Sequence, residues 1–115
     1  MISNPRFSGR CLAAWLAGVA LLLSASGCAT GGPPVQEMSD ARQAIEAARD
    51  AGAEDLASDE LASARAKLVS AESHLRQRSF RSARRDALAA LELAVEARSI
   101  SEASRTNDRV EAGLP

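Results

Sequence analysis

Residues 58–77 read SDELASARAKLVSAESHLRQ, and the spacing of their apolar residues decides the fold. Steps of three and four residues place those residues on one side of an α-helix. Alanine and leucine have high helix propensity, and no proline interrupts the stretch. The sequence therefore predicts an amphipathic helix over residues 58–77, with an apolar face of Leu61, Ala64, Leu68, Ala71 and Leu75.

A helix of the same kind is predicted on each side of this one. Residues 36–51 have an apolar face made of Met38, Ala41, Ala44 or Ile45, and Ala48. Residues 80–104 have a face made of Phe80, Ala83, Ala87, Ala90 or Leu91, Ala94 and Ala97, which Leu88, Val95 and Ile100 widen. Together the patterns predict an all-α fold, a small three-helix antiparallel bundle over residues 36–104.

The boundaries of these helices follow from local signals. Gly52 is expected to stop the first helix, and residues 52–57 to form a short acidic turn. Ser58 is expected to cap the second helix at its N-terminus. Residues 105–115 lose the apolar pattern and are expected to form a frayed tail. Because buried alanine contributes little area, we expect a marginally stable domain that favours a dimer or a partner.

The first 27 residues have the three-part layout of a secretory signal peptide. Arg6 and Arg10 form a basic start, residues 12–23 carry no charge, and residues 24–27 are small. The apolar run is shorter than the roughly 20 residues that a membrane-spanning helix needs. A buried N-terminal helix is the alternative interpretation, but the two arginines and the change of composition after Thr30 favour a signal peptide.

The end of this segment, Ala25, Ser26, Gly27 and Cys28, resembles a bacterial lipobox. The resemblance implies a diacylglycerol on the Cys28 thiol, cleavage before Cys28, and an acyl chain such as palmitate on the new N-terminus. Because Ala29 rather than aspartate follows, it also implies a periplasm-facing anchor in the outer membrane. Ala25 and Gly27 equally satisfy an ordinary signal cleavage site, which leaves a soluble, non-lipidated protein as the alternative. Residues 28–35 would comprise the lipidated Cys28 and a Gly/Pro tether over residues 29–35, which reaches about 25 Å.

Composition narrows the partners of the remaining chain. The formal net charge is −1, and loss of Arg6 and Arg10 would change it to −3, so bulk charge predicts no nucleic-acid binding. Phe80 is the one aromatic residue after Cys28, which is too few to build a base- or sugar-stacking platform. Cys11 would leave with the signal and Cys28 would be capped, so no disulfide is expected.

Charge is distributed unevenly along the second predicted helix. Acidic residues cluster at its start, at Asp50, Glu54, Asp55, Asp59 and Glu60. Basic residues cluster around its end, at Arg76, Arg78, Arg81, Arg84 and Arg85. Both clusters complement the helix dipole. If the first two helices are antiparallel, the arginines also lie beside the tethered end, where they form a candidate membrane-surface patch.

No residue set points to catalysis or to a bound cofactor. His74 is the one histidine, and no second metal ligand stands at helical spacing from it, so we expect it to be solvated beside Arg78 or at the edge of the second helix. No glycine-rich phosphate loop, paired cysteine motif or nucleophile elbow is present. We therefore expect no enzyme activity, no metal site, no small-molecule substrate and no cofactor beyond the covalent lipid on Cys28.

The apolar residues also follow a recognisable order, through Met38, Ala41, Ala44, Ile45 and Ala48, then Ala51, Gly52 and Ala53, then Glu60, Leu61, Ala64, Lys67, Leu68, Ala71 and Leu75, then Phe80, Ala83 and Ala87. Over residues 35–103 this order resembles a family of bacterial lipoprotein domains of unknown function, of the type that can precede an OmpA-like peptidoglycan-binding domain. Arg78 departs from that pattern, because a glycine is frequent there, and Ser58 stands where a proline is common. Residues 75–94 are similar to the helix-turn-helix of a tetratricopeptide repeat.

We therefore expect an envelope lipoprotein with a structural or protein-docking role in the periplasm. Its partners would be the membrane, through the lipid anchor, and an unidentified envelope protein or a second copy. The alternative is a soluble periplasmic protein that self-associates through its alanine-rich faces, as coiled coils do.

Overall fold

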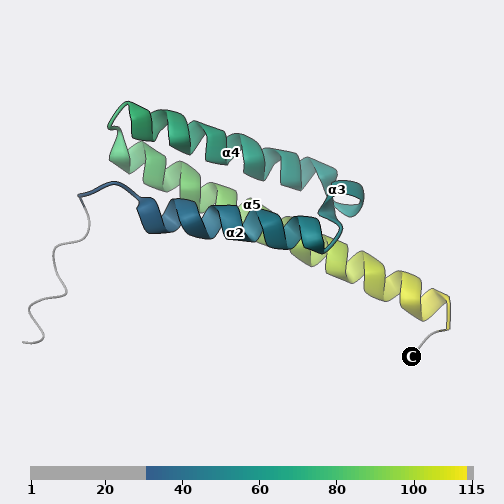
Figure 1. The fold of residues 1–115 in the computed structure, drawn as a ribbon. Coiled ribbons are helices and arrows are strands. Elements are labelled where there is room, and N and C mark those ends of the chain that lie inside the picture. Colours follow the sequence, from purple (N-terminus) through teal and green to yellow (C-terminus); the bar gives the residue numbers. More distant parts are fainter. Residues whose placement is uncertain (1–30, 114–115) are drawn as a thin grey trace, which may run out of the picture. The chain divides into compact units, whose positions relative to one another are not determined.

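A computed structural model of the protein describes residues 31–113, and residues 32–115 form one compact unit. The described part contains four helices and no strand: α2 (Val35–Asp50), α3 (Ala53–Leu56), α4 (Ser58–Arg76) and α5 (Phe80–Glu111) (Figure 1). The all-α prediction is therefore confirmed. The predicted signal peptide, with Ala25, Ser26, Gly27 and Cys28, lies outside the described residues.

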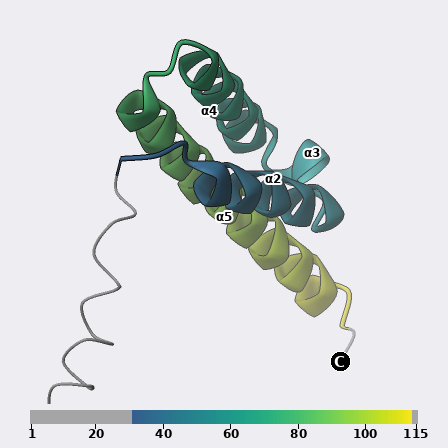
Figure 2. The same ribbon diagram turned by 60° about the vertical axis from the view of Figure 1, so that its left-hand side comes forward.

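The four helices pack together around α5. This helix contacts α2 and α4 more extensively than those two helices contact each other. α4 and α5 are joined by residues 77–79 and lie side by side, as Figures 1 and 2 show. The sequence predicted a turn over residues 52–57, but Ala53–Leu56 forms a one-turn helix of its own. Ala53 and Leu56 have high helix propensity and flank the acidic residues of this segment, which explains why it forms a helix rather than a turn.

The interior of the unit consists mostly of alanine. Except for Ala44, the predicted alanines of the three long helices are buried, and among the described residues Met38, Ile45 and Leu61 are the larger buried side chains of the two clusters. Partly buried hydrophobic residues pack against these clusters: Ala44, Leu68, Leu75, Leu93 and Ile100. Alanine lets helix axes approach toward the short end of the usual spacing of about 8–10 Å. All of these contacts lie within residues 32–115, so the unit holds its own core.

The prediction that Leu88 and Val95 widen the apolar face of α5 was wrong. Leu88 is 47 % exposed and Val95 is 56 % exposed. Each follows a buried alanine by one residue, and one residue turns the side chain by about 100° around the helix. Ile100, by contrast, does pack against the core.

The end of α5 also differs from the prediction. The helix continues past Ser104 to Glu111, into the segment that was expected to fray. Ser104 and Thr106 donate side-chain hydrogen bonds to carbonyls one turn earlier, and no proline or glycine intervenes before Gly113, whose φ is +68°. A left-handed glycine is a common end of a helix.

The turn between α4 and α5 has an unusual residue at its centre. Arg78 adopts a φ of +58°, a left-handed conformation in which glycine is favoured. The backbone N–H of Arg78 donates to the carbonyl of Leu75 at 3.0 Å, and that of Ser79 donates to His74 at 2.9 Å. This pair of bonds is a Schellman motif. The motif reverses the chain and sets the arginines on both sides of it close together.

Candidate functional site

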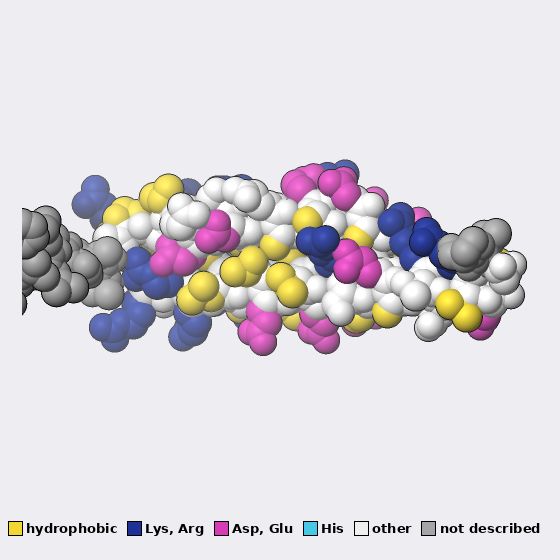
Figure 3. Space-filling model, turned by 90° about the horizontal axis from the view of Figure 1, so that it is seen from below, with side chains coloured by type: hydrophobic (Ala, Val, Ile, Leu, Met, Phe, Trp, Pro, Cys, Tyr) yellow, Lys and Arg dark blue, Asp and Glu magenta, His cyan; other side chains and the backbone are white. Residues whose placement is uncertain are grey.

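The five predicted arginines gather at the end of the unit where α4 meets α5. Arg76 is the last residue of α4, Arg78 lies in the turn, and the other three lie in the first two turns of α5. Figure 3 shows Lys and Arg side chains gathered at this end of the surface, on its left. We call these five residues, Arg76, Arg78, Arg81, Arg84 and Arg85, the basic end.

Arg84 connects the basic end to the start of the helical unit. Its Nε donates to Oε1 of Glu37 at 2.7 Å, and its Nη2 donates to the carbonyl of Gly32 at 3.1 Å. Only about a quarter of each of the Arg84 and Glu37 side chains is exposed. The hydrogen bond from Arg84 lowers the pKa of Glu37. The start of α2 therefore lies beside Arg84.

The other members of the basic end point into solvent. Arg85 is 75 % exposed, and its Nε lies 3.8 Å from Oδ1 of Asp86. Arg76, Arg78 and Arg81 are exposed, and no carboxylate of residues 31–113 forms an ion pair with them. These guanidinium groups therefore remain available for an external anion.

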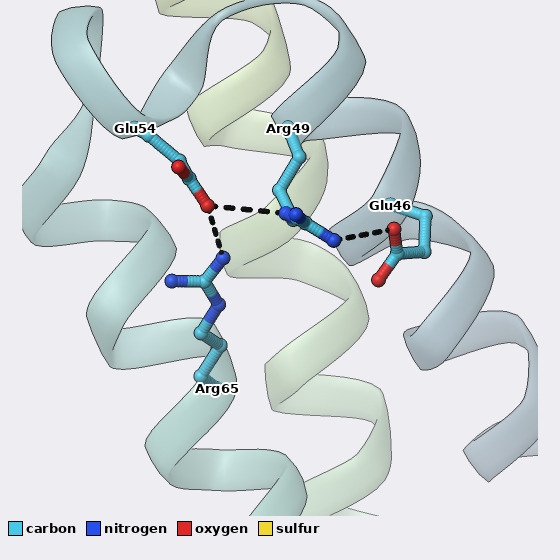
Figure 4. Close-up of polar contacts among 4 residues, drawn as sticks. All are labelled: Glu46, Arg49, Glu54 and Arg65. Carbon is cyan, nitrogen blue, oxygen red and sulfur yellow. Dashed lines mark hydrogen bonds and ion pairs between the residues drawn. The ribbon is translucent and has the colours of Figure 1, made fainter.

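The acidic cluster lies around α3, where part of its charge is neutralised. Glu54 accepts hydrogen bonds from Arg65 at 2.7 Å and from Arg49 at 3.1 Å, and Arg49 also bonds Glu46 at 2.8 Å (Figure 4). The bonds from Arg65 and Arg49 lower the pKa of Glu54. The network joins α2, α3 and α4. Asp50, Glu54, Asp55 and Asp59 are exposed, and Glu60 is partly buried.

The prediction that Ser58 caps α4 was wrong. The capping position is Ala57, and no side chain bonds the free backbone N–H groups there. α3 ends at Leu56, and Ala57 serves both as its C-terminal cap and as the N-terminal cap of α4. Ser58 is therefore already the first helical residue of α4. Asp59 and Glu60 lie in the first turn of α4, where their negative charge suits the helix dipole.

A buried polar cluster between α4 and α5 was not predicted. Oγ of Ser70 donates to Oδ2 of Asp86 at 2.6 Å, and Asp86 is only 6 % exposed. The bond from Ser70 lowers the pKa of Asp86, and the charges of Lys67, Arg85 and His74 act in the same direction. The sequence contained one signal for this cluster, because Asp86 is an acidic residue directly beside the alanine face within residues 83–97. The Ser70–Asp86 bond cross-links the two helices.

His74 was expected to be solvated beside Arg78 or at the edge of the second helix, and it lies at the side of α4 that faces Asp86. Its Nε2 lies 3.5 Å from Oδ2 of Asp86, and its side chain is 32 % exposed. The other ring nitrogen, Nδ1, is buried without a hydrogen-bond partner. His74 stands four residues after Ser70, so both side chains leave α4 on the side that faces α5.

A shallow recess lies at the other end of α2. It has a volume of about 350 Å³, it is open to solvent, and it is lined by Ala47, Asp50, Ala51, Arg98, Glu102 and Arg105. Arg98 donates to Glu102 at 2.7 Å within this lining. The recess carries charges of both signs.

Neither a membrane span nor a metal cluster is seen in residues 31–113. None of the helices there is both long and apolar enough to cross a bilayer. In the same residues, no group of three His, Cys, Asp or Glu side chains could hold a metal ion. The predicted lipidation site Cys28 lies outside this part of the chain.

Comparison with known proteins gives one match. Neither a curated protein nor a solved structure matches the chain. Residues 36–112 match the protein family described as Domain of unknown function (DUF4398). The matched residues include nearly all of the four helices, so the family corresponds to the helical unit described above. Because the match covers well over half of the sequence, the chain belongs to the DUF4398 family.

Proposed function

We propose that the protein is an envelope lipoprotein whose helical unit has a structural or protein-docking role in the periplasm, without catalysis. Residues 1–27 act as a lipoprotein signal peptide, and Cys28 carries the lipid. The anchor lies in the outer membrane, and residues 28–35 tether the helical unit to it. In this proposal, the three long helices work as an antiparallel bundle of TPR-like hairpins that presents a rigid surface to an envelope protein.

The contact of Arg84 with Gly32 and Glu37 is the observation that carries this proposal. It holds Gly32, which follows Cys28 by four residues, at the end of the unit where α2 begins. A module that begins this close to an anchor is held near the bilayer, because four residues reach only about 14 Å when extended. The lipidation itself rests on the resemblance of residues 25–28 to a lipobox.

The fate of Cys28 tests the proposal. The full chain is produced in a Gram-negative host, and the mass of its N-terminal peptide is measured with and without globomycin, which blocks lipoprotein signal peptidase. We expect a peptide that begins at Cys28 and carries a diacylglycerol on the thiol and an acyl chain on the N-terminus, and accumulation of the uncut form under globomycin. Cys28→Ser should abolish both, whereas Cys11→Ser, inside the predicted signal peptide, should change neither. A bare Cys28 in an uncut cytosolic product would refute the proposal.

Self-association without lipid is a second candidate function. The alanine faces are buried inside the unit, so a second copy would have to contact another surface. One surface of α5 exposes Leu88 and Val95, with the partly buried Leu91 between them at helical spacing. Sedimentation of the full chain tests this candidate. Val95→Asn should shift a dimer to monomer, whereas Val69→Asn, at a similarly exposed site on α4, should not.

A further inference from the structure

We propose that the basic end binds the surface of an anionic lipid bilayer through Arg76, Arg78, Arg81 and Arg85. This inference rests on the proposed function for the location of the protein, and it adds which surface of the unit faces the lipid. The partner is the layer of anionic phosphate headgroups. Arginine suits such a partner because its planar guanidinium group bonds phosphate oxygens in pairs.

The basic end differs from the rest of the unit in how its arginines are paired. Outside the basic end, four arginines each bond a glutamate within 3.1 Å: Arg42, Arg49, Arg65 and Arg98. Among the described residues outside the basic end, Lys67, Arg105 and Arg109 form no such pair. At the basic end, three of the four proposed lipid-binding arginines have no carboxylate partner in the described chain, and the fourth, Arg85, has only a long contact of 3.8 Å. Positive charge is therefore left uncompensated at this end.

The chain enters the helical unit beside the basic end. Arg84 holds the carbonyl of Gly32 at 3.1 Å and the carboxylate of Glu37 at 2.7 Å. The segment that leads back to Cys28 therefore starts within one side-chain length of the basic end. An anchor at Cys28 would keep the exposed arginines near the headgroups, whereas the acidic cluster around α3 lies at the opposite end of α2.

The turn between α4 and α5 brings arginines from two helices to the same end of the unit. The Schellman motif at residues 77–79 joins two helices side by side, so that arginines 76 and 81 come from adjacent helix ends with Arg78 between them. Side chains that leave two helix ends and their connecting turn can reach one flat surface together. Each basic residue near an anionic surface raises membrane partitioning by roughly fivefold.

Vesicle binding by residues 32–115 tests the inference, because this segment contains its own core and lacks Cys28. The segment is sedimented with vesicles of phosphatidylglycerol and phosphatidylethanolamine, and separately with vesicles of phosphatidylcholine alone. We expect binding to the anionic vesicles only, with an affinity that falls as salt is added. Circular dichroism verifies that each protein used melts cooperatively.

Two sets of four substitutions with the same change in charge identify the surface. Replacing all four lipid-binding arginines by glutamine should weaken binding by roughly several hundredfold. The matched control replaces four arginines remote from the basic end and should retain most of the binding: Arg65→Gln, Arg98→Gln, Arg105→Gln and Arg109→Gln. Equal losses in both sets, equal binding to the neutral vesicles, or no binding by the parent would each overturn the inference. None of these outcomes depends on lipidation, which the mass of Cys28 tests separately.

Discussion

Replacing Arg78 by glycine should stabilise the helical unit. A residue with a side chain in the left-handed region costs about 1–2 kcal/mol, and Arg78 has a φ of +58°. Glycine removes that cost but loses about 0.5–1 kcal/mol more backbone entropy on folding. The side chain of Arg78 is exposed and makes no ion pair in the described chain, so the substitution removes no ion pair. The two ranges give a net gain of up to about 1.5 kcal/mol, with a central value of about 0.75 kcal/mol.

Urea and thermal unfolding followed by circular dichroism measure this gain. For a domain of this size, 1 kcal/mol corresponds to a rise in Tm of about 4–8 °C. Gln77→Gly is the matched control, because Gln77 has a φ of −81° and glycine there should destabilise the unit. If Arg78→Gly unfolds at a lower urea concentration than the parent, the left-handed residue carries no strain and the reasoning is refuted. The same variant should bind anionic vesicles more weakly, because it lacks one arginine of the basic end.

Three further predictions concern the core, the buried acid and the glycine that ends α2. Leu61→Ala should lower the free energy of unfolding by about 2–5 kcal/mol in urea titrations, because Leu61 is the largest fully buried side chain of residues 31–113. Ser70→Ala should cost about 1–3 kcal/mol near neutral pH, because the buried carboxylate of Asp86 loses its hydrogen-bond donor. The pKa of Asp86 lies below its ordinary 3.8 in the folded chain, so this stabilisation is complete above 3.8 and disappears as pH falls through the folded value. As the pH is lowered below 4, urea titrations should therefore show that the free energy of unfolding falls less in Ser70→Ala than in the parent. An equal fall in both proteins would contradict the assignment. Gly52→Ala should cost about 1–2 kcal/mol, because φ is +90° and the new methyl group would lie 3.2 Å from the guanidinium of Arg105. Adding Arg105→Ala separates the two causes in thermal melts, since it relieves the contact and leaves φ unchanged.

The helices could be predicted because the spacing of alanine and leucine is a property of the chain alone. Ala64 and Ala71 are fully buried, as that spacing predicted. The exposure of Leu88 and Val95 could not be predicted in the same way, because the hydrophobicity of a residue does not determine how far the buried face extends around the helix. That width depends on how closely the neighbouring helices approach, and small alanines make it narrow.

The position of the basic end could also be predicted in part. Reversal of the chain between residues 51 and 58 places the end of the second helix near the start of the first, and the Arg84–Glu37 contact agrees with this. The contact itself joins residues 47 positions apart, and it depends on how each helix is rotated about its axis. The Ser70–Asp86 bond depends on the same rotation, which the three-four pattern leaves undetermined.

The alanine interior has a consequence for the thermodynamics of folding. A buried leucine or methionine loses rotamer freedom when it is fixed in a core, whereas alanine has no rotamers to lose. The unit therefore gives up little side-chain entropy when it folds, which compensates for the small area that each methyl group buries. Most of its conformational entropy loss must then arise from the backbone, so substitutions that restrict the unfolded chain should change its stability more than substitutions that add apolar area.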